Sequence, residues 1–108
     1  MVRFIIIWHD TPTDTEAFDQ HYRDVHIPLA NKMPGLRRYS LSRNLKPVRG
    51  DPPYCVAELE WDDPETMKRD MGSPEGKATG EDVELMKQWS PGVQSMIYEL
   101  DDVREPVS

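Results

Sequence analysis

The sequence predicts an α+β fold of the ferredoxin-like βαββαβ type, with an antiparallel four-stranded sheet and both helical regions on one face. Three observations lead to this prediction. Runs of apolar and β-branched residues of strand length recur along the chain. Two helical regions, each with a recognisable start signal, lie between them. The resulting order (strand, helix, strand, strand, helix, strand) is that of two split βαβ units.

The first strand is expected over Val2 to Trp8, where the sequence VRFIIIW is rich in β-branched and aromatic residues. A Thr-x-x-Glu capping box, Thr13 to Glu16, then predicts the start of the first helix. Met33 to Gly35 should end this helix, because proline cannot continue it and glycine accepts a left-handed turn. Spacings of four, three and four predict one apolar stripe on the helix, made by Phe18, Tyr22, Val25 and Leu29.

The second and third strands are expected over 36–45 and 54–61, joined by a loop over 46–53 that contains three prolines and one glycine. Strand alternation divides the third strand into two faces. One face is predicted to carry Cys55, Ala57, Leu59 and Trp61. The other is predicted to carry Tyr54, Val56, Glu58 and Glu60.

The second helical region should begin at Asp63-Pro64, an N-cap residue followed by proline in the first turn. Ser73-Pro74 repeats that signal, so a break is expected near Gly72. A restart is expected over 79–82. The residues expected to point inward after it are Val83, Met86 and Trp89. The last strand is predicted over 94–100.

Composition predicts one domain over 1–100 and a polar tail over 101–108. The net charge of −7 argues against a nucleic acid or an anionic membrane as partner, since phosphate binding needs a basic surface. The chain contains no apolar run of the roughly 20 residues that a membrane span requires. A single cysteine, Cys55, excludes an internal disulfide and agrees with a cytoplasmic location.

The face of the sheet without helices is expected to expose either Ile5 and Ile7 or Phe4 and Ile6. An apolar patch of that kind indicates a partner. Two such sheets packed against each other would bury it in a symmetric homodimer.

The end of the first helix combines unusual features. Pro28 cannot donate to the carbonyl group of Asp24, so the helix is expected to bend near His26 and to leave a concave spot there. Tyr22 and His26, four residues apart, should be neighbours on the helix surface. An imidazole exchanges protons near neutral pH, and an adjacent tyrosine hydroxyl can orient a carbonyl group or stabilise an enolate.

These residues carry a resemblance to a known family. The pattern F-x-x-x-Y-x-x-x-H-x-P-L, here from Phe18 to Leu29, followed by Pro34-Gly35-Leu36, resembles the signature of the EthD family, named for ethyl tert-butyl ether degradation. The resemblance spans residues 1–100. It implies the dimeric α/β barrel superfamily, which includes lactone isomerases, polyketide cyclases, decarboxylases and cofactor-free oxygenases. Fold alone does not select among these reactions.

The resemblance and the residues together predict His26 as general acid or base and Tyr22 as its polar neighbour, unless Tyr22 belongs only to the core. His21 is expected to face solvent. No metal or organic cofactor is required. The metal alternative is weak because His21 and His26 are five residues apart. Further candidates for substrate binding are Trp8, His9, Arg38, Tyr39 and Trp89, where Trp8 and His9 must face opposite sides of the strand, as must Arg38 and Tyr39.

The predicted function is that of a homodimeric, cofactor-independent acid–base enzyme. It would isomerise, cyclise, dehydrate or decarboxylate a small aromatic or polyketide-like carbonyl compound. A non-catalytic accessory protein that binds a small molecule in the same cleft and a cofactor-free monooxygenase are the alternatives.

Overall fold

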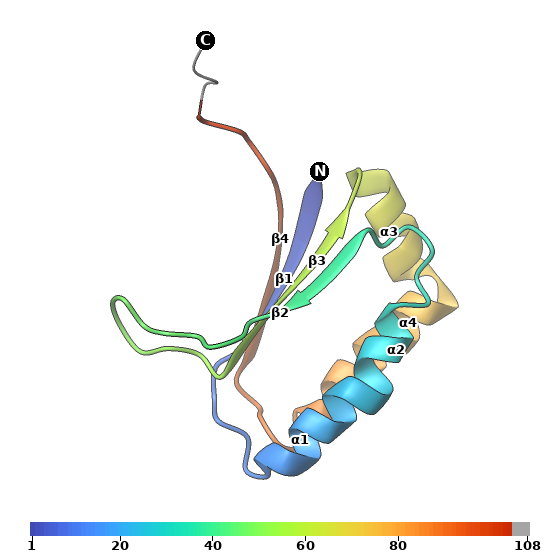
Figure 1. The fold of residues 1–108 in the computed structure, drawn as a ribbon. Coiled ribbons are helices and arrows are strands. Elements are labelled where there is room, and N and C mark those ends of the chain that lie inside the picture. The colour runs from blue at the N-terminus through green and yellow to red at the C-terminus, as the bar shows by residue number, and fades with distance from the viewer. Residues whose placement is uncertain (105–108) are drawn as a thin grey trace.

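The computed structural model describes residues 1–104, in which a four-stranded antiparallel sheet is covered on one face by helices (Figure 1). The predicted ferredoxin-like α+β fold is confirmed. The last four residues of the predicted tail, 105–108, lie outside the described residues. The elements in chain order are β1 (Val2–Trp8), α1 (Thr15–His21), the π-helical turn η1 (Tyr22–His26), α2 (Ile27–Ala30), β2 (Arg38–Leu41), β3 (Cys55–Trp61), α3 (Pro64–Gly72), α4 (Pro74–Met86) and β4 (Val93–Glu99).

The sheet has the order β2-β3-β1-β4, so β1 lies in the interior and β2 and β4 form the edges. In register, Trp8 pairs with Cys55 of β3 and with Val93 of β4. Alternate residues of β1 enter the core beneath the helices, among them Ile6 and Trp8. The other set faces away, and it includes Ile5, only 6 % exposed although no helix covers it. The helix-free face, here called the open face, therefore carries Ile5 and Ile7 rather than Phe4 and Ile6.

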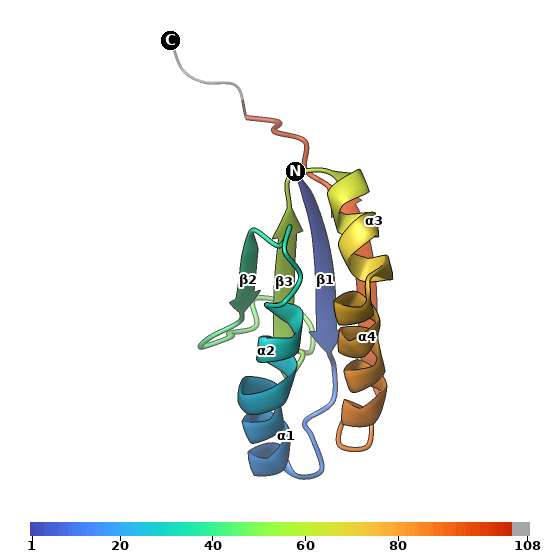
Figure 2. The same ribbon diagram turned by 90° about the vertical axis from the view of Figure 1, so that its right-hand side faces the viewer.

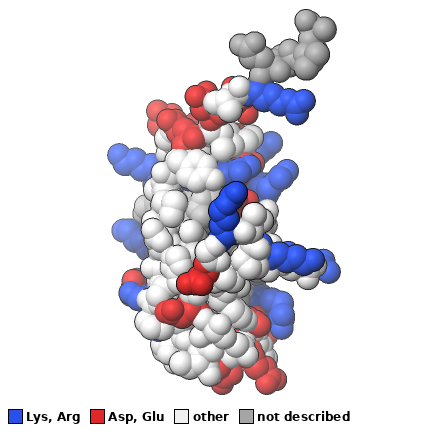
Figure 3. Space-filling view, turned by 90° about the vertical axis from the view of Figure 1, so that its left-hand side faces the viewer, with Lys and Arg blue, Asp and Glu red and all other residues white. Residues whose placement is uncertain are grey.

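The helices form two columns that run beside each other on one side of the sheet (Figure 2). One column is α1–η1–α2, and the other is α3–α4. The long loop between β2 and β3 projects toward the opposite side of the sheet (Figure 1). The open face carries uncharged surface with single basic and acidic side chains between, not a field of one sign (Figure 3). Within residues 1–104, no helix is long and apolar enough to cross a membrane.

The first helix begins one residue later than the capping box predicts. Asp14 is the N-cap: its backbone is extended and its carboxylate accepts a hydrogen bond from the Ala17 amide at 3.0 Å. Thr13 is held outside the helix because its amide donates to the Trp89 carbonyl at 2.9 Å. The prediction that Thr13 caps the helix is therefore wrong.

The expected bend near His26 takes the form of the π-helical turn η1. The Ile27 amide donates to the Tyr22 carbonyl, five residues back, and Pro28 follows without an amide of its own. In a regular α-helix, side chains four residues apart point in directions that differ by about 40° around the helix axis. The wider π turn reduces this difference, so the buried residues recur every fourth position: Phe18, Tyr22, His26 and Ala30. Val25, which the α-helical spacing assigned to the stripe, is instead 40 % exposed.

The second helical region breaks where the sequence predicts. Ser73 ends α3, and its hydroxyl caps α4 by accepting from the Gly76 amide at 3.2 Å. The expected restart over 79–82 is wrong, because α4 begins at Pro74 and continues through these residues.

Three strands are shorter or shifted relative to prediction. Regular pairing of the second strand covers only Arg38–Leu41, and the last strand is Val93–Glu99. Tyr54 precedes the third strand instead of beginning it, so strand alternation does not apply to it. Its side chain packs on Phe18 of α1, on the helical side, and not with Val56 and the glutamates. The division of the remaining strand residues into two faces agrees with the register.

Candidate active site

A buried carboxylate joins the two helical columns. Asp82 of α4 is 8 % exposed and accepts hydrogen bonds from two histidines of the other column. Its Oδ2 lies 2.7 Å from His26 Nδ1, and its Oδ1 lies 2.8 Å from His21 Nε2. When ionised, the carboxylate only accepts, so each of these ring nitrogens carries the hydrogen. That leaves Nε2 of a neutral His26 with a lone pair.

His26 is buried, with 1 % of its surface exposed. Burial lowers the pKa of His26 below its ordinary value, with His21 contributing in the same direction, while the hydrogen bond and charge of Asp82 oppose the shift. The result is an imidazole that stays neutral at pH 7 and is held in one tautomer. These are the properties of a general base oriented by a carboxylate.

His21 does not face solvent as predicted. Its ring donates to Asp82 and packs on Trp89, with ring centroids 5.5 Å apart. The prediction assumed regular α-helical geometry through His26. The π turn changes the rotation between His21 and His26, so both reach the same residue on α4.

Tyr22 lies next to His26, one turn earlier on the same buried line. The two rings meet edge to face with centroids 5.2 Å apart. The Tyr39 hydroxyl, on β2, donates to the Tyr22 hydroxyl at 3.3 Å. Burial raises the pKa of Tyr22 to about 12 and raises the pKa of Tyr39 as well. Both hydroxyls therefore stay protonated and act as hydrogen-bond donors at neutral pH.

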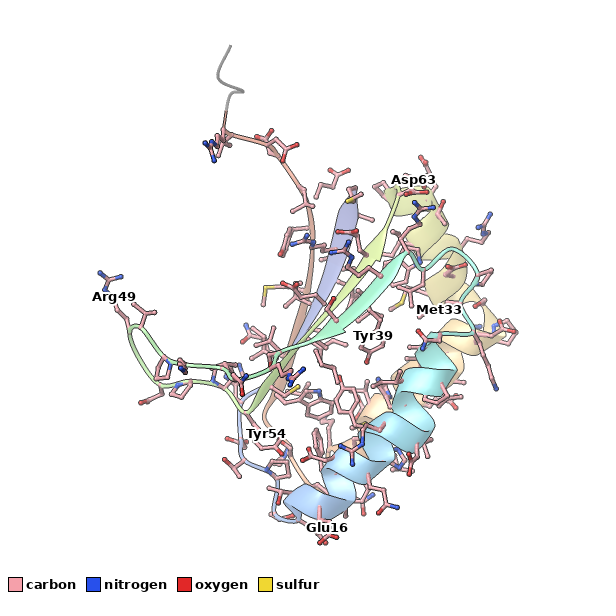
Figure 4. All side chains as sticks on the ribbon, in the orientation of Figure 1. Glu16, Met33, Tyr39, Arg49, Tyr54 and Asp63 are labelled. Atoms are coloured by element: carbon pink, nitrogen blue, oxygen red, sulfur yellow. The ribbon has the colours of Figure 1, made fainter. Side chains whose placement is uncertain are left out.

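A hollow of about 340 Å³ opens between α1–η1 and the adjoining edge of the sheet. Tyr39 and Tyr54 lie on this helical side of the strands, whereas Arg49 lies far off at the tip of the β2–β3 loop (Figure 4). We call this space the Tyr22 hollow, and its lining residues are Phe18, Asp19, Tyr22, Arg23, Leu41, Ser42, Tyr54 and Cys55. Its volume is at the lower end of ligand sites, which is typical of a small ligand.

Tyr22, rather than His26, lines this hollow. The expected concave spot is thus displaced by one helical turn, because the bond to Asp82 turns the His26 ring toward α4. His26 remains in contact with the hollow only through the Tyr22 ring.

The other predicted binding residues are distributed over the molecule. Trp8 is completely buried and packs on Phe18 with ring centroids 5.1 Å apart. His9 faces the other way, is exposed and contacts Gln94 at 2.9 Å. Trp89 packs on His21 on the side of α1 away from the Tyr22 hollow, and lines a separate hollow there.

Arg38 and Tyr39 project from opposite faces of β2, as strand alternation requires. Tyr39 pairs with Leu59 on the helical side, while Arg38 pairs with Glu60 on the open face and is exposed. Only Tyr39 of this pair reaches the cluster around Tyr22. A role for Arg38 in binding substrate stays a prediction.

Cys55 lines the hollow, and burial raises the pKa of its thiol, so it stays protonated and a weak nucleophile. Within residues 1–104, no group of three or more potential ligand side chains is arranged to hold a metal ion.

Asp82 is the site residue that sequence reasoning missed. It is 56 residues from His26, and it was assigned only to a helix restart. One local signal existed: a carboxylate at the centre of a helix whose neighbours Thr79 and Met86 are core residues.

Comparison with known proteins assigns the family. The family model described as EthD domain matches residues 10–86. An uncharacterized 11.0 kDa protein in the thcB–thcC intergenic region of Rhodococcus erythropolis is 32 % identical over 85 residues, 77 % of this chain and 81 % of that protein. The crystal structure of an EthD family protein from Bacillus halodurans is 34 % identical, with a TM-score of 0.79 over 94 % of this chain and 99 % of the other. The chain belongs to the EthD family.

More distant structures share the fold alone. SnoaB of Streptomyces nogalater, a cofactor-independent oxygenase, is 18 % identical, with a TM-score of 0.64 and 96 % and 97 % of the two chains covered. A dimeric ferredoxin-like protein of unknown function from Thermobifida fusca is 14 % identical, with a TM-score of 0.61 and 92 % and 90 % covered. Some proteins with this fold are therefore enzymes that need no cofactor, and some are dimers.

Proposed function

We propose that this chain is a cofactor-independent acid–base enzyme that acts on a small aromatic or polyketide-like carbonyl compound. The reaction would be an isomerisation, cyclisation, dehydration or decarboxylation. The single observation that carries the proposal is the 2.7 Å bond between Asp82 and a buried, neutral His26. An imidazole fixed in this way accepts a proton with little reorganisation.

The roles follow from what each side chain contacts. Tyr22 lines the hollow and would hold the carbonyl oxygen of the substrate by donating a hydrogen bond. His26 does not line the hollow but packs against the Tyr22 ring, so it would take the proton from the carbon next to that carbonyl group, through Nε2, once the ligand reaches past this ring. Asp82 would act as a positioning residue, since it keeps the hydrogen of His26 on Nδ1.

Deuterium exchange tests this proposal without knowledge of the natural substrate. The protein is incubated in D₂O with acetophenone or 2-tetralone, and loss of the proton signal next to the carbonyl group is followed by NMR. We expect catalysed exchange that slows at least about tenfold in His26→Gln, because glutamine keeps a donor for Asp82 but accepts no proton. Val25→Ala, on the exposed side of the same helix, is the matched control and should retain full exchange.

The same experiment separates the alternatives. A compound that binds but exchanges no faster than in buffer favours a binding protein and contradicts the acid–base proposal. Oxygen consumption in the presence of these compounds would indicate a cofactor-free monooxygenase instead.

We also propose that the chain forms a homodimer through its open face. Ile5 and Met96 are neighbours in register on this face, without any helix over them. Arg3 and Glu60 form an ion pair there at 3.1 Å, so a second copy would meet both charges and apolar surface. A dimeric protein with the same fold supports this proposal. The single cysteine, Cys55, supports a cytoplasmic location.

A further inference from the structure

Trp8 has a buried polar atom without a hydrogen-bond partner. The side chain is completely buried, and its Nε1 is the one buried side-chain nitrogen or oxygen in residues 1–104 for which the structure gives no partner. By contrast, the indole nitrogen of Trp61 donates to Asp70 at 2.9 Å. Leaving a buried donor unpaired is costly, so an orphan of this kind often marks a position where a ligand or water belongs.

A second donor lies beside the first. The Trp8 and Tyr22 rings meet edge to face with centroids 6.4 Å apart, and the Trp8 indole lowers the pKa of Tyr22 against the larger rise that burial causes, yet the indole N–H makes no hydrogen bond. Two hydroxyl groups, those of Tyr22 and Tyr39, share one bond. Because that bond uses one of their two protons, the Tyr22 proton has no acceptor among the described residues.

The acceptor side chains on the wall of the hollow already have partners. The Asp19 carboxylate accepts from the Tyr54 hydroxyl at 2.8 and 3.0 Å, and the Ser42 hydroxyl accepts from the Val56 amide at 3.0 Å. Cys55 accepts hydrogen bonds only weakly. A water molecule would satisfy both donors but would bring two hydrogens that also need acceptors. An oxygen atom that only accepts matches this position better.

We propose that Trp8 Nε1–H and Tyr22 O–H form a two-donor site for one oxygen atom of a bound ligand, the carbonyl or enolate oxygen of a small aromatic compound in the Tyr22 hollow. The inference rests on the proposed function, since it names the atom of the substrate that the site recognises. It also gives Trp8 a role as hydrogen-bond donor, where the sequence predicted only a residue that binds substrate.

The Tyr39–Tyr22 bond explains how the site admits a ligand. At 3.3 Å it is long for a bond between two hydroxyls, whose usual separation is about 2.7–2.8 Å. Such a weak bond is easily exchanged for a shorter one to a carbonyl oxygen. Tyr22 lines the hollow and Trp8 does not, so a ligand that enters there meets Tyr22 first and then the Trp8 ring, which packs edge to face against Tyr22.

The test compares two ligands that differ in one atom. Acetophenone carries a carbonyl oxygen, and α-methylstyrene has a CH₂ group in its place. Binding to the ¹⁵N-labelled full chain is followed by NMR at the three indole N–H signals, assigned by triple-resonance spectra. We expect acetophenone to bind about fivefold more tightly than α-methylstyrene and to move the Trp8 signal downfield. The Trp61 signal should stay unchanged because its N–H remains bonded to Asp70.

Conservative variants assign the donors. Tyr22→Phe keeps the ring but removes the free hydroxyl proton, and it should reduce the preference for acetophenone at least twofold. Tyr98→Phe is the matched control: Tyr98 pairs with Arg3 on the open face, away from the hollow, so the preference should be retained. Trp8→Phe should abolish the downfield shift and reduce the preference. If that core variant does not fold, the wild-type spectra and Tyr22→Phe still decide the question.

The outcomes separate this site from the proposed reaction. Equal affinity for the two ligands with an unchanged Trp8 signal overturns the oxygen site, and that result is also expected if a retained water occupies the donors. A shifted Trp8 signal without deuterium exchange upholds the oxygen site and contradicts the acid–base function. Deuterium exchange without a shifted Trp8 signal upholds the acid–base function and contradicts the oxygen site.

Discussion

Two buried aspartates, Asp70 and Asp82, connect the second helical column to the rest of the molecule in different ways. Asp70 of α3 is 1 % exposed and receives the Trp61 indole N–H and the Gly35 amide, both on Oδ2. Asp82 of α4 receives His21 and His26 on separate oxygens. The first carboxylate therefore contacts an indole and a backbone amide, and the second contacts two imidazoles.

The difference separates a structural carboxylate from a chemical one. Both satisfy buried donors, as a folded protein requires. Asp82 is bonded to two imidazoles, and one of them, His26, packs on the Tyr22 ring that lines the hollow, so under the proposed function the burial of Asp82 has a consequence for reactivity. The role of a buried aspartate therefore depends on which groups it bonds, and not on how deeply it is buried.

The largest effect on stability is expected from Asp70→Ala. This change leaves the Trp61 and Gly35 donors unpaired in the core, which should lower the free energy of unfolding by about 3 kcal/mol. Urea denaturation of the purified variant measures the loss. A cost below about 1 kcal/mol would mean that Asp70 does not have the structural role assigned here.

Substitution of each aspartate by asparagine should distinguish the two positions. In Asp82→Asn one histidine faces an amide N–H, which forces a change of tautomer, and we expect deuterium exchange of acetophenone to fall about a hundredfold. Asp70→Asn is the matched control, because one amide oxygen can replace Oδ2 for both donors and exchange should be nearly unchanged. Similar losses in both variants would contradict the division of roles.

The smallest expected effect is a loss of stability at acid pH. Because burial lowers the pKa of His26, the unfolded chain binds a proton near pH 6.5 before the folded chain does. The contribution of His26 to the free energy of unfolding is fully present above pH 6.5. It is lost as the pH falls from that value toward the lowered pKa of His26 in the folded chain. Urea unfolding at pH 8 and pH 5 should show an acid loss about 1 kcal/mol larger in wild type than in His26→Gln. An equal loss would mean that His26 does not titrate as described.

Local signals in the sequence predicted most of the fold. Strand runs, the proline-led helix starts after Asp63 and Ser73, and the open apolar face all depend on a few neighbouring residues. Errors arose where longer-range contacts changed the local outcome. Asp14 rather than Thr13 caps the first helix, because the Thr13 amide donates to the Trp89 carbonyl. Val25 lies outside the buried stripe because of the π turn.

By itself, the sequence determined the order of the elements and the adjacency of Tyr22 and His26, because spacing along one helix fixes which side chains are neighbours. Only the tertiary structure decided that Asp82 joins His21 and His26, and that the Trp8 ring, with its unpaired Nε1, packs against Tyr22. These contacts join residues on different elements. Their geometry depends on how two helical columns and a sheet pack, and no local pattern encodes that packing.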